Sequence, residues 1–230
     1  MVFGGIQKST LIDYPGKVGC VLFFSGCNFH CPYCHNPELA KGMALEAWTE
    51  PQAFDFLEER KRFLEGVVLS GGEPCLHPDL IRVCRAIRQM GYPIKLDTNG
   101  SYPDVLNNLI SEGLVDYVAM DIKTVPENYP LYVQKNCNAD AIESSIQLIR
   151  SSGISHEFRT TCIRPLIDAR IMESICSLIQ GADLYVLQQF RLSHVLNPDF
   201  FKENDYRITE SDLTAFRKIA EKWVGSCIIR

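Results

Sequence analysis

Three cysteines stand close together in the chain, at Cys27, Cys31 and Cys34, separated by three and by two residues. One loop can therefore wrap three thiolates around a single inorganic centre. Two kinds of metal site compete for this pattern. Zinc prefers a closed tetrahedral set, in which His30 or His35 would have to be the fourth ligand. A four-iron cluster also suits a compact cysteine loop, and a set of only three cysteines would leave one iron open to an outside ligand.

The remaining cysteines are isolated in the sequence, and several fall at expected core positions of strands or helices. We expect them to be small buried apolar side chains rather than ligands. They are Cys20, Cys75, Cys84, Cys137, Cys162, Cys176 and Cys227. Ten cysteines in 230 residues are a smaller fraction of the chain than the roughly 8–10% that is typical of a small disulfide scaffold. The first twenty residues also lack the layout of a signal peptide, so we expect free thiols or metal ligands in a cytoplasmic protein.

The composition is that of a globular chain, with 46% hydrophobic and 22% charged residues. No apolar run approaches the ~18 residues that a membrane-spanning helix needs. The 23 basic and 28 acidic residues give a formal charge of −5, so no overall positive field attracts the chain to a phosphate backbone. We therefore expect neither a membrane nor a nucleic acid as a partner.

Short apolar, β-branched runs alternate with amphipathic stretches along the chain. The runs predict strands at 18–24, 67–70, 94–98, 117–122, 157–163 and 184–189. The stretches predict helices at 51–64, 78–90, 103–112, 139–150, 169–179 and 210–223. Thr49, with Gln52 three residues on, is a candidate cap for the first helix. Gly91, Gly113 and Gly153 stand where helix ends need a left-handed residue.

Strands that alternate with helices indicate an α/β fold with a parallel sheet and right-handed crossovers. Such a sheet is either open and doubly wound or closed into a barrel. A full (β/α)8 barrel takes about 250 residues and eight units, so six units favour a partial barrel if the arrangement is barrel-like. No linker or repeat marks a boundary, and we expect a single domain over residues 1–230.

Polar residues follow the expected strands at their carboxyl ends, where α/β folds gather their chemistry. The run Gly71-Gly72-Glu73 follows the second strand. Its glycines would let the backbone approach a ligand, and its carboxylate could accept from an ammonium group. A tight strand-to-helix turn explains the same run equally well. The third strand ends in Asp97-Thr98-Asn99.

Charged side chains also share single faces of later strands, because strand side chains alternate. Asp121 and Lys123 share one face of the fourth strand, and Glu157, Arg159 and Thr161 share one face of the fifth. Buried charges must either pair with each other or hold a charged ligand. An internal salt bridge is therefore the alternative to a binding site on both strands.

The cysteine loop, with Tyr33 just before its last cysteine, resembles the CxxxCxxC loop of radical S-adenosylmethionine (radical SAM) enzymes, which are built on partial (β/α)6 barrels. The resemblance implies that Cys27, Cys31 and Cys34 hold a [4Fe–4S] cluster. Its fourth iron would be chelated by the amino and carboxylate groups of S-adenosylmethionine. Tyr33 would contact the adenine, and Gly71-Gly72-Glu73 would hold the methionine amino group.

The same resemblance assigns cofactor roles to the other strand ends. Lys123 would meet the methionine carboxylate and the ribose, with Asp97 and Asp121 nearby around a monovalent cation. Gln189 stands where some related enzymes carry a histidine that meets the ribose, and His194 is a rival candidate. The cofactor-binding set is completed by Cys34, His35, Thr98 and Asn99. No side chain is expected to act as acid or base, because the cofactor supplies the reactive radical.

A longer run around the loop resembles the activating enzymes of glycyl-radical proteins, above all the anaerobic ribonucleoside-triphosphate reductase activating proteins. It consists of Ser9, Asp13-Tyr14-Pro15-Gly16, Phe24, Gly26 and Asn36-Pro37. Only fourteen residues separate Cys34 from Thr49, which leaves no room for a module with extra clusters. The resemblance implies that reductive cleavage of S-adenosylmethionine gives a 5′-deoxyadenosyl radical. That radical would take hydrogen from a glycine of the reductase, with a flavodoxin-like or ferredoxin-like protein as electron donor.

Two other functions share part of these features. A radical SAM enzyme that acts on a small molecule, such as 7-carboxy-7-deazaguanine synthase, would need a sealed barrel mouth rather than one open to a protein loop. A zinc-stapled α/β binding protein would share the cysteines and have no catalysis. Colour and metal content separate this last case, because zinc sites are colourless and iron–sulfur sites are brown.

Overall fold

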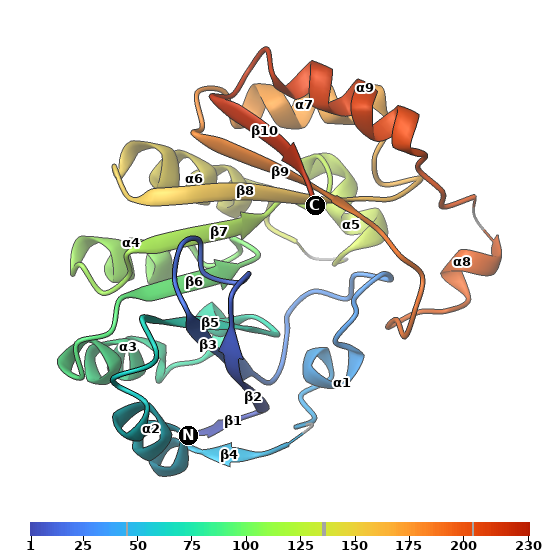
Figure 1. Cartoon of the computed structure of the whole chain (residues 1–230). Helices are drawn as coiled ribbons and strands as arrows, with labels where there is room; N and C mark the ends of the chain where they lie inside the picture. The colour runs from blue at the N-terminus through green and yellow to red at the C-terminus, as the bar shows by residue number, and fades with distance from the viewer. Residues whose placement is uncertain (45, 135–136, 204) are drawn as a thin grey trace. The chain divides into compact units, whose positions relative to one another are not determined.

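The structure is a computed structural model of the chain that describes residues 1–44, 46–134, 137–203 and 205–230 (Figure 1). The chain divides into two compact units. Unit 1 comprises Met1–Asn28, Asn36–Thr98 and Asp104–Val118, and unit 2 comprises Phe29–His35, Asn99–Pro103 and Ala119–Arg230. The single domain expected over 1–230 therefore stays a prediction.

Unit 1 is built on parallel strands with an antiparallel edge. Its strands are β1 (Val2–Phe3), β2 (Gly5–Thr10), β3 (Gly19–Phe24), β4 (Trp48–Thr49), β5 (Gly66–Gly71), β6 (Ile94–Thr98) and the start of β7 (Tyr117–Asp121). Strands β6, β5 and β3 are hydrogen-bonded in this order and run parallel, and β2 pairs antiparallel with β3. Strands β1 and β4 form a separate antiparallel pair.

The helices of unit 1 include the amphipathic ones that the sequence predicts near 51–64, 78–90 and 103–112. They are α1 (Pro37–Ala40), α2 (Glu50–Glu59), α3 (Leu80–Gln89), α4 (Pro103–Ser111, of which Pro103 belongs to unit 2) and the 3-10 turn η1 (Pro74–Leu76). Helix α3 buries Leu80, Val83, Cys84 and Ile87. Its outward arginines pair with acids of three other segments, in the pairs Arg82–Glu50, Arg85–Glu112 and Arg88–Asp116. Burial of the apolar face contributes more to stability than these exposed pairs, each worth about 0–1 kcal/mol.

The two faces of the unit 1 sheet differ in character. Leu22, Leu69 and Leu96 occupy matching register positions and are fully buried. On the other face, Val21 pairs in register with Val68, and Val68 with Lys95. Because side chains alternate along a strand, these three share that face. It therefore carries a lysine beside apolar residues, with Ser70 and Asp97 further along the same face.

Unit 2 is also parallel. It contains the end of β7, then β8 (Ser155–Cys162), β9 (Leu184–Gln189) and β10 (Ser226–Ile229), with η2 (Pro126–Asn128), α5 (Tyr129–Tyr132), α6 (Ala139–Ser151), α7 (Ala169–Leu178), α8 (Phe200–Glu203) and α9 (Glu210–Ala220). Strands β10, β9 and β8 lie in this order. The backbone of Ile122, just past β7, donates to the carbonyl of Arg159 in β8 (2.8 Å).

Helices α7 and α9 lie side by side along one face of these strands (Figure 1). The hydroxyl of Tyr185 in β9 contacts the sulfur of Met172 in α7 at 3.6 Å. Tyr185 and Leu187 therefore point toward the helices, and alternation turns Val186 and Gln188 to the opposite face. That opposite face is the one that Arg159 shares, because Arg159 pairs in register with Val186.

The prediction of an α/β fold with a mainly parallel sheet is confirmed. All six predicted strands are present, with ends that differ by no more than two residues. Three predicted helix ends are also confirmed, because Gly91, Gly113 and Gly153 have φ of 89°, 64° and 72°. The first predicted helix, 51–64, is wrong at its end, since α2 stops at Glu59. No helix within the described ranges is long and apolar enough to cross a membrane.

Candidate cofactor site

The predicted site residues are divided between the two units. Unit 1 contains Cys27, Gly71, Gly72, Glu73, Asp97 and Thr98, and unit 2 contains Cys31, Tyr33, Cys34, His35, Asn99, Asp121, Lys123 and Gln189. Within the parts of the chain that the structure describes, no three His, Cys, Asp or Glu side chains converge as a metal-binding group. The three-cysteine metal site therefore stays a prediction from the sequence.

The cysteine loop is held by its backbone. The N–H of Cys34 donates to the carbonyl of Cys31 (3.0 Å), so these two thiols come from one turn. Segments that follow β7 and β9 fix this turn through backbone hydrogen bonds. The N–H of His30 donates to the carbonyl of Val133 (2.9 Å), and the N–H of Leu196 donates to the carbonyl of Cys34 (3.0 Å). Cys31 is buried, whereas Cys27 and Cys34 are half-buried. The backbone of the turn from Cys31 to Cys34 is thus fixed by contacts within unit 2.

The isolated cysteines behave as expected for core residues. Six of them are buried: Cys20, Cys75, Cys84, Cys162, Cys176 and Cys227. Burial raises the pKa of the Cys20, Cys84, Cys162 and Cys176 thiols to about 12 and that of Cys227 to about 11. Cys137 is half-buried. A thiol that stays protonated is a poor metal ligand, so these core thiols are not suited to hold a metal.

Tyr33 lies inside unit 2 with its hydroxyl buried. The side chain is 4% exposed, and its hydroxyl has no hydrogen-bond partner within the described ranges. Its ring meets the edge of Phe190 at 6.4 Å, and His35 stacks on the same Phe190 at 5.4 Å. Burial raises the pKa of Tyr33 well above its usual value, so the phenol is a donor. A buried hydroxyl without a partner costs free energy that a bound molecule can recover.

The glycine run after β5 is built for close backbone approach. Gly71 has φ +113°, a conformation that favours glycine. A Cβ on Gly72 would stand 2.0 Å from the carbonyl oxygen of Gly26, just before Cys27. The backbone N–H of Glu73 donates to that same carbonyl (2.9 Å). In this structure the glycines therefore serve contact between two backbone segments of unit 1, one of which leads into the cysteine loop.

Glu73 is fixed within unit 1. Its carboxylate is 1% exposed and accepts from the Thr98 hydroxyl (2.8 Å) and from the Cys75 backbone (3.0 Å). The structure thus brings together two residues that the sequence placed at the ends of different strands. Asn99, on the unit 2 side of the division, is 6% exposed and accepts from the backbone of Ser101 at 3.0 Å.

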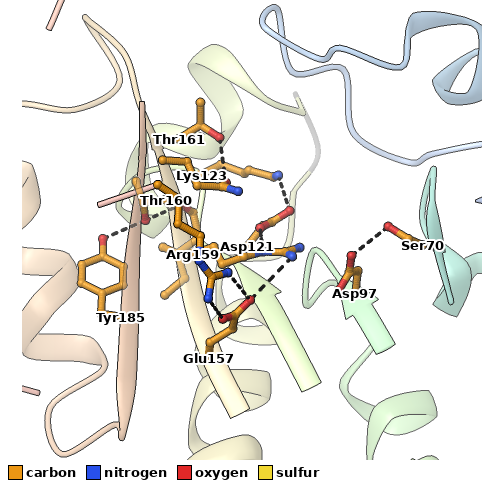
Figure 2. A network of polar contacts seen from close by, with 12 residues as sticks. Ser70, Asp97, Asp121, Lys123, Glu157, Arg159, Thr160, Thr161 and Tyr185 are labelled. Atoms are coloured by element: carbon orange, nitrogen blue, oxygen red, sulfur yellow. Dashed lines mark hydrogen bonds and ion pairs between the residues drawn. The ribbon is translucent and has the colours of Figure 1, made fainter. Parts of the chain in front are cut away.

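Asp97 is held from both sides by residues that the sequence analysis did not assign. The Ser70 hydroxyl donates to Oδ2 of Asp97 (2.9 Å; Figure 2). The ammonium of Lys95 pairs with Oδ1. The signal was available, since Ile94-Lys95-Leu96-Asp97 alternates apolar and charged residues. A strand with this alternation places Lys95 and Asp97 on one face.

Unit 2 contains an extended charge network (Figure 2). Asp121 accepts from Arg159 Nε at 2.7 Å and from Lys123 Nζ at 3.0 Å. Arg159 also lies 3.9 Å from Glu157, which pairs with Arg230 at 3.1 Å. The salt bridge that the sequence left open as an alternative is therefore formed. It does not exclude a ligand, because an ammonium has three donors and Lys123 can hold a carboxylate beside Asp121.

The position of Lys123 is further fixed by aromatic residues. Its backbone N–H donates to the Tyr129 hydroxyl (3.0 Å), and the Tyr129 ring meets Phe29 of the cysteine loop at 5.7 Å. Burial works against the charge on Lys123, but Asp121 outweighs it and raises the pKa of Lys123 well above its usual value. The amine is thus a permanent cation placed near the cysteine loop.

The predicted ribose residue Gln189 lies on the opposite face of β9 from Arg159 and Thr161. Thr161 of β8 pairs in register with Gln188, and the Thr161 hydroxyl lies 3.4 Å from Oε1 of Gln188. Gln189 has the opposite orientation and is exposed, as is His194. Gln188 therefore shares a face with Arg159 and Thr161, whereas the assigned Gln189 does not.

The charge network predicts an acid-sensitive step in stability. Burial favours the neutral carboxyl, but Arg159 and Lys123 outweigh it and hold the pKa of Asp121 well below its usual value. Such a group stabilises the fold above its unfolded pKa of about 3.9 and loses that contribution as the pH falls through its folded pKa. Asp121→Asn should lower the free energy of unfolding at pH 7 by about 3–5 kcal/mol. Urea titrations should show this difference narrowing below about pH 4.

The matched control is Asp55→Asn on the exposed side of α2. It should leave both the stability at pH 7 and its pH dependence close to those of the wild type. A constant difference between wild type and Asp121→Asn from pH 7 to pH 2 would contradict the role given to Asp121.

Comparison with known proteins places these features in a family. Residues 21–175 match the radical SAM superfamily. A Methanocaldococcus jannaschii protein assigned as a glycyl-radical enzyme activating enzyme is 35% identical over 98% of this chain and 94% of its own. The pyruvate formate-lyase-activating enzyme of Clostridium pasteurianum is 31% identical over 56% of each chain. A radical SAM methyltransferase from Sphaerobacter thermophilus shares the fold, with a TM-score of 0.72, 15% identity and coverage of 96% of this chain and 68% of its own.

The family implies a [4Fe–4S] cluster and S-adenosylmethionine, and the residues described fit this pair. The loop offers soft thiolate donors, Lys123 offers a fixed cation for a carboxylate, and Tyr33 offers a buried donor within unit 2. The zinc-stapled alternative without catalysis does not agree with the family match. The chain is therefore a member of the radical SAM superfamily, among its glycyl-radical enzyme activating enzymes.

Proposed function

We propose that this enzyme generates a glycyl radical on an anaerobic ribonucleoside-triphosphate reductase. The observation that carries the choice of partner is Tyr14. This tyrosine is part of the run that resembles the reductase activases, and many other activases have glycine there. Its ring is 3% exposed and packs with Val21 and Val68, 6.3 Å from the ring of Tyr117. A glycine at this position would leave a cavity in unit 1, so the core of this chain is built around the tyrosine.

The short connection after the cysteine loop supports the same proposal. Between Cys34 and Thr49 the described residues form only α1 and the start of β4, and the next cysteine is Cys75. The chain therefore has no cysteines for a second cluster in this segment. Reductive cleavage consumes an electron that must come from outside the enzyme, and we propose a flavodoxin-like or ferredoxin-like protein as its source.

The proposed roles of the side chains follow from their chemistry. Cys27, Cys31 and Cys34 would hold the cluster, and Lys123 would hold the carboxylate of S-adenosylmethionine. When bound, this cofactor pair supplies a carbon-centred radical by one-electron cleavage of a carbon–sulfur bond. Tyr33 would donate from its buried hydroxyl, and the apolar packing around it would exclude water. The substrate hydrogen would come from a glycine Cα of the partner.

The test uses the anaerobically reconstituted enzyme with S-adenosylmethionine, a reductant and a candidate reductase. We expect 5′-deoxyadenosine together with a glycine-centred signal in electron paramagnetic resonance. A reductase whose radical-site glycine is replaced by alanine is the matched control, and it should give no such signal. Turnover of a tetrahydropterin with no radical on any reductase would instead favour the small-molecule alternative and reject this partner.

A further inference from the structure

The lysine that shares a sheet face with Val21 and Val68 in unit 1 is unusual for its burial. Lys95 is 2% exposed in the middle of β6, beside Val68 in register, and its ammonium lies 5.9 Å from the centre of the Tyr117 ring. Val68 belongs to the apolar cluster that also contains Tyr14 and Val21. A charged amine is costly to bury unless it is paired. The position of Lys95 therefore calls for a fixed anionic partner.

That partner is Asp97, two residues further along β6. Oδ1 of Asp97 pairs with Lys95, and Oδ2 accepts from Ser70 at 2.9 Å. Both carboxylate oxygens are thus engaged by groups of unit 1 itself. The ring of Tyr117 adds a favourable cation–π contact to the same ammonium. The charge of Asp97 is neutralised within the strand that carries it.

The second acidic residue assigned to a monovalent cation is satisfied in the same way. In unit 2, Oδ1 of Asp121 accepts from Arg159 and Oδ2 accepts from Lys123. A sodium or potassium ion bound to either carboxylate would have to displace, or lie close to, a cationic side chain. Like charges at such short distances repel strongly in a buried site. The donor set of this chain therefore does not fit a free monovalent cation.

We propose that the Lys95 ammonium takes the place of a free monovalent cation at Asp97. The counter-ion of this carboxylate is then a side chain of the enzyme itself. The proposal does not rest on the partner or on the proposed function, because it concerns the charge state of unit 1. It makes Lys95 a positioning residue, which acts through the carboxylate that it holds.

The first test compares the reconstituted wild-type enzyme in potassium, sodium and tetramethylammonium chloride at equal ionic strength. Tetramethylammonium is too large to occupy a carboxylate site in the core. We expect the same Tm and the same Kd for S-adenosylmethionine in the three salts. A higher Tm or a tighter Kd in potassium or sodium than in tetramethylammonium would overturn the proposal.

The second test removes the built-in cation. Lys95→Met keeps an unbranched side chain that is one atom shorter but leaves Asp97 without its ammonium, and we expect Tm to fall by roughly 10 °C in tetramethylammonium. Potassium or sodium should restore part of this loss, because a small ion can then neutralise Asp97. The double variant Lys95→Met/Asp97→Asn lacks the carboxylate and should show no such response. The proposal would be overturned if potassium or sodium did not raise the Tm of the single variant. It would also be overturned if either ion raised the Tm of the double variant.

The test stays decisive if Lys95→Met fails to fold. Lys95→Arg keeps a cation at this position and should melt at the same temperature in all three salts. A dependence of its Tm on potassium or sodium would count against the proposal as directly as the same dependence in the wild type.

Discussion

Cys31→Ala should leave the enzyme without its cluster and reduce the cleavage of S-adenosylmethionine to background. Cys31 is the buried cysteine of the loop, and its carbonyl accepts from Cys34 in the turn that carries both thiols. Two remaining thiolates cannot hold a four-iron cluster in the three-cysteine arrangement of this family. Iron and sulfide content, together with 5′-deoxyadenosine formation after anaerobic reconstitution, measures the effect.

Cys176→Ala is the matched control for this result. Cys176 is also fully buried, but in α7, away from the loop in sequence. It should retain its iron and its cleavage activity, with only a modest loss of stability from the smaller side chain. Cleavage that persists in Cys31→Ala at the level of this control would show that the cluster assignment is wrong.

Gly72→Ala should produce the second large effect. Its new methyl group would stand 2.0 Å from the oxygen and 2.6 Å from the carbon of the Gly26 carbonyl, so backbone rather than a flexible side chain must move. Overpacking of this kind costs about 1–3 kcal/mol or more. Displacement of Gly26 also shifts the entry to Cys27. Urea denaturation should show the loss of stability, and the iron content after reconstitution should fall with it.

Gly5→Ala is the control for the glycine effect. A Cβ on Gly5 would meet only the Phe23 ring at 3.7 Å, an ordinary contact in β2. Its free energy of unfolding should stay within about 1 kcal/mol of the wild type. Equal behaviour of the two alanine variants would mean that the close approach of Gly72 to Gly26 has no role in stability or cluster loading.

The strands were predictable because burial on both faces leaves uninterrupted apolar runs, as in Val67-Val68-Leu69. Strand β2 was missed for the opposite reason. Its middle residues Gln7, Lys8 and Ser9 are exposed and polar, and only pairing with β3 makes it a strand. Strand β10, Ser226–Ile229, is as short as many loops and gains its order from β9.

Contacts between side chains were predictable where both residues belong to one strand. They were less predictable where the residues come from different segments. The pairing of Asp121 with Lys123 follows from alternation, and the structure forms it. Gln189 was assigned from the position of a histidine in related enzymes and not from alternation, and it lies on the opposite face of β9 from Gln188. The contact between Glu73 and Thr98 joins the loop after β5 to the end of β6, and no local pattern could have predicted it.

The buried thiols have a practical consequence for work on this enzyme. Alkylating reagents attack thiolates, and the core cysteines, with pKa values of about 11 to 12, keep their protons near neutral pH. Cys27 and Cys34 are more accessible to solvent. Mass spectrometry of iodoacetamide-treated protein can thus count how many molecules in a preparation have lost their iron, without reliance on colour or turnover.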